Sequence, residues 1–191
     1  MENISDTIYI HRILSGDTGA FSFLVEKYQN MVYTLALKIL RNNEDAEDAA
    51  QEVFVKCYQA LKRYNAQAAF STWLYKITYN HAIDLLKSKN KKWKITEWKS
   101  DMEPGMMPHY SLDEKIDLKE IQILLKGAIH RLSPDEQVIV TLYYYEGLAL
   151  KEIADILGIR ENNVKIKLHR IRTKLLQLLK SKNEIISILN L

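Results

Sequence analysis

The chain has 191 residues, of which 47% are hydrophobic, and its formal net charge is +3. At about 150 residues per domain, this length allows one domain or two small ones, and the hydrophobic content excludes an intrinsically disordered chain. The single cysteine, Cys57, excludes an internal disulfide. No hydrophobic run reaches the ~18 residues of a membrane span, and the first residues do not resemble a signal peptide. We therefore expect a cytoplasmic protein without membrane insertion.

Charge is distributed along the chain in alternating blocks. Residues 61–100 contain nine basic and two acidic side chains, and residues 151–191 contain nine basic and four acidic ones. Acidic side chains outnumber basic ones in the block that precedes each, residues 1–60 and 101–150. Two separated basic blocks indicate two anion-binding surfaces, with the acidic blocks serving another contact.

The first half of the chain predicts long helices. No Gly or Pro occurs between Ala20 and Glu103, so tight turns are disfavoured there. Hydrophobic residues recur every three or four positions along residues 21–39, 46–60 and 70–77. This period places them on one face of each of three helices.

A second helical unit is predicted after an acidic stretch that contains Pro and Gly. We interpret this stretch, residues 93–114, as a flexible linker between domains at 1–92 and 115–191. In the second domain, Ser133 is followed by Pro and, three positions after it, by Glu136. This order is typical of a helix N-terminus with a capping box. The predicted fold class is all-α, with two helical domains.

Residues 148–175 have the pattern of a helix-turn-helix, in which a short helix, Gly158 and a longer helix follow one another. On the longer helix, from about Asn162 to Leu179, the basic residues point away from one apolar stripe. That stripe consists of Val164, Leu168, Ile171 and Leu175. A helix with an apolar back and a basic front suits the major groove of DNA, where Lys and Arg contact phosphates or guanine edges.

Residues 62–92 form a different basic region, in which aromatic and basic side chains alternate. Aromatic rings stack on unpaired bases while basic side chains follow the backbone, so the pattern is typical of single-strand binding. Phe70 and Trp73 share the apolar stripe of their helix and are interpreted as core. A separate stripe is predicted to face nucleic acid, and it consists of Lys76, Asn80, Lys87 and Lys91.

Catalytic and metal chemistry are not indicated. The acidic residues 44–48 crowd the start of a predicted helix, where the helix dipole favours negative charge. The five histidines lack metal-ligand spacing, and no nucleotide-binding loop or nucleophile motif occurs. Cys57 lies on an apolar stripe and is interpreted as a small core residue. We expect no metal, no cofactor and no enzymatic activity.

Three segments resemble bacterial sigma factors of the sigma-70 family. Residues 45–54 (DAEDAAQEVF) resemble the segment that binds core RNA polymerase, and residues 70–77 (FSTWLYKI), with Asn80 and Asp84, resemble the −10-element segment. Residues 146–165 resemble the helix-turn-helix that binds the −35 element. The chain length and the short linker resemble the extracytoplasmic-function (ECF) group, which keeps only sigma domains 2 and 4.

The resemblance implies an RNA polymerase sigma factor that directs core polymerase to promoters and nucleates promoter melting in response to stress or envelope signals. The implied partners are the β′ and β subunits of bacterial core RNA polymerase, promoter DNA and an anti-sigma factor. Domain 2, residues 1–92, would bind core polymerase and the −10 element. Domain 4, residues 115–191, would bind the −35 element.

The residues and the resemblance together predict three sets of contacts. Core polymerase is predicted to bind Asp48, Gln51, Glu52 and Lys56. The −10 element is predicted to bind Lys62, Arg63, Tyr64, Tyr75, Lys76, Tyr79, Asn80, Lys87 and Lys91. The −35 element is predicted to bind Arg160, Asn162, Asn163, Lys165, Ile166, Lys167, His169, Arg170 and Lys174.

The chain departs from the family pattern in domain 4. Ala149 stands where relatives have a Ser or Thr cap, and Asn162-Asn163 stands where they often have Gly-Thr. Ile166 replaces a usual Ser and is predicted to be exposed, within reach of a thymine methyl group.

Two other functions are weighed against this one. A helix-turn-helix repressor or activator with a helical sensor domain would need neither the aromatic and basic region nor the polar face with Asp48, Gln51 and Glu52. A metal-dependent nuclease would need site chemistry that the acidic cluster does not supply.

Overall fold

The computed structural model describes residues 6–93 and 118–180, and within these ranges every regular element is helical. The predicted all-α fold is therefore confirmed. The first unit contains α1 (Asp6–Leu14), η1 (Thr18–Ala20), α2 (Phe21–Leu40), α3 (Asn43–Ala60), η2 (Leu61–Arg63) and α4 (Phe70–Trp93). The second contains α5 (Leu118–His130), α6 (Pro134–Val140), η3 (Thr141–Tyr145), α7 (Leu150–Leu157) and α8 (Glu161–Lys180).

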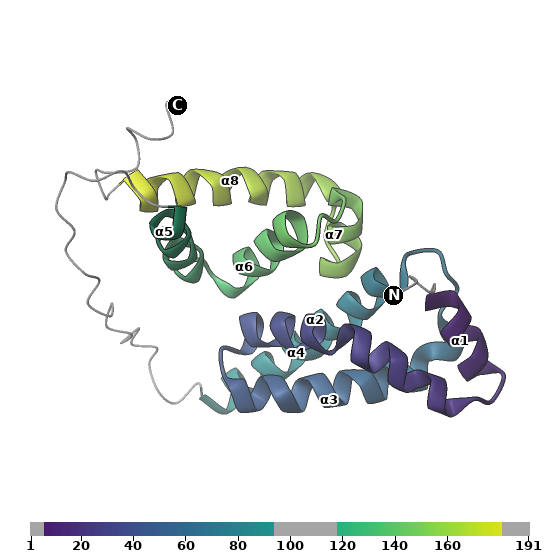
Figure 1. The fold of residues 1–191 in the computed structure, drawn as a ribbon. Helices are drawn as coiled ribbons and strands as arrows, with labels where there is room; N and C mark the ends of the chain where they lie inside the picture. The colour runs from purple at the N-terminus through teal and green to yellow at the C-terminus, as the bar shows by residue number, and fades with distance from the viewer. Residues whose placement is uncertain (1–5, 94–117, 181–191) are drawn as a thin grey trace.

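The first unit is a bundle of α2, α3 and α4, with α1 at one end (Figure 1). Its core contains the predicted stripes, including Leu24, Val32 and Val53, each with no exposed surface. Cys57 is fully buried, and burial raises its thiol pKa to about 12. The interpretation of Cys57 as a core residue is confirmed.

The structure contains a helix, α1, that the sequence pattern does not predict. A nine-residue helix is marginal on its own in water, so its stability depends on tertiary contacts. Ile10 and Ile13 are buried against the bundle. Asp6 accepts hydrogen bonds from Lys27 Nζ and Tyr28 Oη of α2, each at 2.6 Å.

The polar bend between α2 and α3 consists of two residues with distinct roles. Arg41 ends α2 in the left-handed conformation, with φ of 55°. Asn42 caps α3, because its Oδ1 accepts from the backbone N–H of Asp45 at 2.9 Å.

The second unit has the predicted helix starts and stops. Ser133 and Glu136 form the predicted capping box of α6, with bonds of 2.8 and 3.3 Å. Gly158 ends α7 with φ of 66°. Helix α8 buries Val164, Leu168 and Ile171 against the other helices of the unit, as its apolar stripe predicts.

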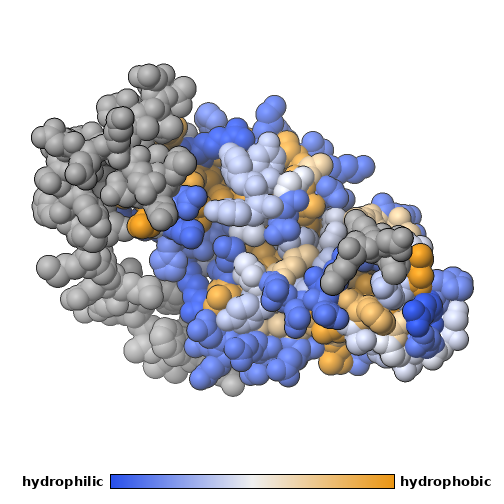
Figure 2. Space-filling model, in the orientation of Figure 1, coloured by the Kyte–Doolittle hydropathy of each residue, from blue (hydrophilic) through white to orange (hydrophobic). Residues whose placement is uncertain are grey.

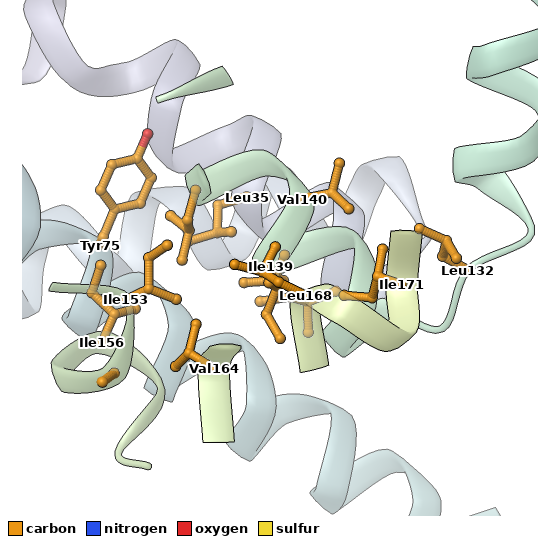
Figure 3. Close-up of a cluster of buried hydrophobic side chains, with 14 of the residues drawn as sticks. Leu35, Tyr75, Leu132, Ile139, Val140, Ile153, Ile156, Val164, Leu168 and Ile171 are labelled. Carbon is orange, nitrogen blue, oxygen red and sulfur yellow. The ribbon is translucent and has the colours of Figure 1, made fainter. Parts of the chain in front are cut away.

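A single apolar cluster joins the two units. Leu35 of α2 and Tyr75 of α4 lie in it beside Ile153 and Ile156 of α7 (Figure 3). Hydrogen bonds between described residues also connect the units. Thr72 Oγ1 donates to Glu152 Oε1 at 3.0 Å, and the Arg41 guanidinium donates to the Leu132 carbonyl at 2.8 Å. The tertiary structure thus packs α7 directly against α4.

The predicted linker, residues 93–114, lies outside the described residues apart from Trp93. The domain boundaries at 92 and 115 therefore stay predictions. Among the helices in residues 6–93 and 118–180, none combines the length and the hydropathy that crossing a membrane requires.

Candidate functional site

The predicted polymerase-binding residues lie together on the outer side of α3. We call this set the α3 face; it consists of Asp48, Gln51, Glu52 and Lys56, all exposed. The opposite side of α3 is buried and carries small residues, among them Ala46 and Ala49. Hydrophilic residues gather at the lower left of the coloured part of Figure 2, over the region where Figure 1 places much of α3.

A histidine of α4 contacts two residues of the α3 face. The Nδ1 atom of His81 lies 2.6 Å from Lys56 Nζ, and its Nε2 atom lies 2.9 Å from Glu52 Oε2. His81 itself is only 6% exposed. The pKa of His81 is lowered mainly by burial and secondly by the nearby Lys56 ammonium. Glu52 and Asp84 oppose this shift. Sequence reasoning missed His81, because its partners are set by how α3 packs on α4.

The acidic start of α3 is not arranged as a metal site. Across the part of the chain that the structure describes, no three His, Cys, Asp or Glu side chains are grouped to hold a metal ion. Asp45 instead forms an ion pair with Lys89 of α4. The cluster thus serves the helix N-terminus and an interhelical contact.

The loop between η2 and α4 is shaped by Tyr64. Its ring centroid lies 5.2 Å from that of Trp73 and 5.7 Å from that of Phe70. Its hydroxyl donates to the Ala68 carbonyl at 2.8 Å, which closes the loop. Phe70 is buried, which confirms its core interpretation, and Trp73 is half-buried. The half-buried Tyr64 therefore supports the loop, whereas the neighbouring predicted residues Lys62 and Arg63 are exposed.

The predicted −10 residues of α4 divide into exposed and covered sets. Lys76, Asn80 and Lys87 are exposed, while the side chain of Lys91 lies outside the described residues. Tyr75 is 2% exposed.

Tyr75 is buried in the described arrangement, so its predicted DNA contact, which needs an accessible ring, stays a prediction. The cause is α7, which lies over this side of α4 (Figure 3). Burial, followed by the nearby Glu146 carboxylate, raises the pKa of the Tyr75 hydroxyl. Tyr79, next along the same side, is half-buried, and burial followed by Asp135 raises its pKa. A base contact by these two rings stays a prediction for an arrangement in which the second unit has moved away from α4.

The predicted −35 residues are almost all accessible. We call the exposed set at the start and front of α8 the α8 face; it consists of Arg160, Asn162, Asn163, Lys165, Ile166, Lys167, His169 and Arg170. Ile166 is 43% exposed, as its angular position on the helix predicts. The apolar stripe on the opposite side of α8 is buried, so packing fixes the position of the helix while its basic side stays exposed to solvent.

Contacts on both flanks hold α8 in place. Lys174 is half-buried, and its Nζ donates to Glu136 Oε2 at 2.8 Å, so this predicted DNA contact is already ion-paired. On the other flank, Arg172 Nε donates to the Tyr144 hydroxyl at 2.7 Å. The Arg172 guanidinium also lies 5.8 Å from the ring centroids of Tyr143 and Tyr144.

The missing Ser or Thr cap of α7 is compensated by Glu152. The Ala149 N–H donates to Glu152 Oε2 at 3.0 Å, which retains one half of a capping box. The other oxygen of Glu152 accepts from Thr72 of α4. The departure from the family pattern at Ala149 thus leaves the helix start satisfied and connects it to the first unit.

Two family models match the two helical units. The model for Sigma-70 region 2 matches residues 24–92, and the model for Sigma-70, region 4 matches residues 122–175.

Several bacterial sigma factors are similar to nearly the whole chain. The ECF RNA polymerase sigma factor SigW of Bacillus subtilis is 30% identical over 176 residues, covering 87% of this chain and 92% of the relative. The RNA polymerase sigma-H factor of Pseudomonas aeruginosa is 30% identical, covering 87% and 90%. The ECF RNA polymerase sigma-E factor of Escherichia coli is 29% identical, covering 90% and 92%.

Solved structures share the fold. CnrH, determined with the cytosolic domain of CnrY, has a TM-score of 0.62 at 21% identity, covering 91% of this chain and 96% of CnrH. The sigma factor RpoE of Bartonella quintana, determined with the anti-sigma factor NepR, has a TM-score of 0.62 at 20% identity, covering 84% and 96%. With both family regions present in order and relatives matched along their length, the chain belongs to the ECF sigma factors of the sigma-70 family, which act as RNA polymerase sigma factors in transcription initiation.

Proposed function

We propose that the two domains divide the work of promoter recognition among three surfaces. The α3 face binds the β′ subunit of core polymerase, α4 and the loop before it bind the melted −10 strand, and the α8 face binds duplex −35 DNA. The observation that carries this proposal is the set of exposed polar residues on α3 and α8, each opposite a buried apolar side. The protein acts as a binding subunit and supplies no catalysis of its own.

The α3 face has the geometry of a protein-docking surface. Its four residues are exposed together on one helix that is fixed from behind by Val53 and Cys57. A rigid backbone with a polar front loses little conformational entropy when a partner binds.

The α8 face has the geometry of a major-groove reader. Its residues include Arg170 and Lys167, which can contact phosphates, and Ile166, which can contact a thymine methyl group. The contacts of Lys174 and Arg172 on either side of α8 restrict its rotation about its own axis, which supports a defined orientation in the groove.

In the described arrangement, the two proposed DNA-binding surfaces differ in how accessible they are. The α8 face is open, whereas α7 covers Tyr75 on α4. Contact between Tyr75 and a −10 base therefore requires the two domains to separate. We propose that binding to core polymerase drives this separation, because it holds the domains apart on different subunits.

The relatives support two further parts of the proposal. CnrH and RpoE were determined with CnrY and with the anti-sigma factor NepR, respectively. We propose that an anti-sigma factor also binds this chain and that the signal it transmits arises at or beyond the cell envelope. Its site of action is the cytoplasm, where bacterial RNA polymerase transcribes.

The proposal is tested by reconstitution with core polymerase on genomic DNA, followed by mapping of RNA 5′ ends. The expected result is a defined set of start sites that share −35 and −10 sequences. Gln51→Ala should weaken binding to core polymerase without changing the helical spectrum. Tight binding to duplex promoter by the free protein, with no binding to core polymerase, would instead support a repressor.

A further inference from the structure

We propose that His81 is a positioning residue for polymerase binding, because it holds Glu52 and Lys56 of the α3 face in one fixed orientation. This inference rests on the proposed function of the α3 face. His81 belongs to α4 and is not itself part of that face, since only 6% of it is exposed.

The contacts of His81 require one particular form of its ring. Nδ1 lies 2.6 Å from the Lys56 ammonium, which can only donate, so Nδ1 must be unprotonated and accept. Nε2 lies 2.9 Å from a Glu52 carboxylate oxygen, within ion-pair distance, but the two atoms do not form a hydrogen bond in this arrangement. A proton on Nε2 places a positive N–H beside that carboxylate. A neutral imidazole with its proton on Nε2 therefore accepts from Lys56 and keeps an electrostatic contact with Glu52.

The arrangement places one buried ring between two exposed groups of opposite charge. Glu52 and Lys56 are four residues apart on α3, so they already share one side of the helix. A direct ion pair between two long, exposed side chains would leave both mobile. Contact with a buried ring restricts both side chains, so less rotamer entropy is lost when polymerase binds.

Acid should release this arrangement. The charged groups that face His81 are Lys56 and Glu52 from α3 and Asp84 from its own helix. Burial and Lys56 favour the neutral ring more than the two carboxylates favour the charged one, so its pKa lies below the ordinary value of 6.5. Protonation below that pKa removes the acceptor for Lys56 and sets two positive groups against each other.

The experiment measures the Kd of the full-length protein for core polymerase from pH 7.5 down to the lowest pH at which circular dichroism shows that the protein stays folded. His81→Leu keeps the buried volume and removes both ring contacts. At pH 7.5 it should bind core polymerase about three- to tenfold more weakly, the range expected when a long side chain must be ordered on binding. His81→Gln, which retains a donor and an acceptor, should stay within about twofold of the unmodified protein.

The pH profile distinguishes positioning from a merely structural role. The ratio of the Kd of His81→Leu to that of the unmodified protein should shrink toward one as the pH falls through the lowered pKa of His81. His81→Gln, which cannot gain a proton in this range, should lose less affinity over the same interval. In a background carrying Glu52→Gln and Lys56→Ala, His81→Leu should add less than about a twofold change, because its two partners are already gone.

Controls separate the possible failures. His11→Leu, on the exposed side of α1, should leave the Kd unchanged. If His81→Leu binds normally while Gln51→Ala binds weakly, the α3 face is used but His81 does not position it, and the inference is overturned. If Gln51→Ala, Glu52→Gln and Lys56→Ala all bind normally, the proposed function of the face fails as well. If His81→Leu does not fold, His81→Gln decides, and a pH profile equal to that of the unmodified protein would overturn the inference.

Discussion

Helices α4 and α8 are both predicted to contact DNA, yet the structure uses their surfaces differently. Helix α8 buries one stripe against its own unit and leaves its basic front exposed. Helix α4 contributes to two clusters, because Phe70 and Leu74 pack within the first unit while Tyr75 and Ala82 pack toward the second. A helix with one apolar stripe, such as α8, packs with that stripe inward and keeps its other side exposed. Aromatic residues outside the stripe, such as Tyr75 of α4, give a second helix an apolar surface to pack against.

This difference gives the two surfaces different conditions for binding. In the proposed function, the α8 face needs no rearrangement to reach duplex DNA, whereas the covered side of α4 binds DNA only after α7 is removed. Under the proposed function, the domain that melts DNA is thus covered by the domain that reads the duplex. Four substitutions test this comparison, from the largest expected effect to the smallest.

Ile153→Ala tests the shared cluster. Ile153 is fully buried in α7 beside Tyr75, so its truncation leaves a cavity and should lower the free energy of unfolding by about 2–5 kcal/mol. Ile166→Ala on the exposed front of α8 is the matched control and should change it by no more than about 0.5 kcal/mol. Chemical denaturation followed by circular dichroism measures both. Equal losses would contradict the contrast between the two surfaces.

Arg170→Ala tests the open front of α8. Loss of a phosphate contact should weaken −35-dependent binding by about tenfold and flatten its salt slope by about one unit. Lys174→Ala should change both quantities less, because Lys174 already pairs with Glu136. Salt titrations of promoter binding by the reconstituted holoenzyme supply the measurement. An equal effect of the two variants would mean that the Lys174 ion pair opens on DNA.

Thr72→Val tests the polar contact that connects α4 to α7. Removing the hydroxyl leaves Glu152 without one partner and should weaken the closed arrangement by about 1 kcal/mol, which raises the open population about fivefold. Small-angle scattering should then show a larger radius of gyration. Thr173→Val, whose hydroxyl bonds only within α8 at the His169 carbonyl, is the control and should leave that radius unchanged.

Glu136→Gln tests the ion pair between Glu136 of α6 and Lys174 of α8. Burial alone would raise the pKa of Glu136, but Lys174 and Ser133 outweigh it and lower the pKa below the ordinary value of 4.5. The stabilisation is therefore present above pH 4.5 and is lost as the pH falls through the lowered pKa. At pH 7 the variant should be less stable by about 1 kcal/mol or less, and the difference should vanish in acid. A difference that does not depend on pH would contradict this origin.

The sequence by itself determined the features that one segment encodes. The capping box at Ser133, the stop at Gly158, the exposed Ile166 and the buried Cys57 all follow from period and position within a single helix or turn. Such local signals need no knowledge of the partner surface. These local signals were enough to predict the all-α fold and the exposed polar sides of α3 and α8.

Only the tertiary structure decided which faces meet. Thr72 and Glu152 are 80 residues apart in sequence, Lys174 and Glu136 are 38 apart, and His81 and Lys56 are 25 apart. Periodicity shows that Tyr75 lies on a helix surface, but not that α7 covers it. Which surfaces pack together is set by shape and buried area summed over whole helices, and no single segment contains that information.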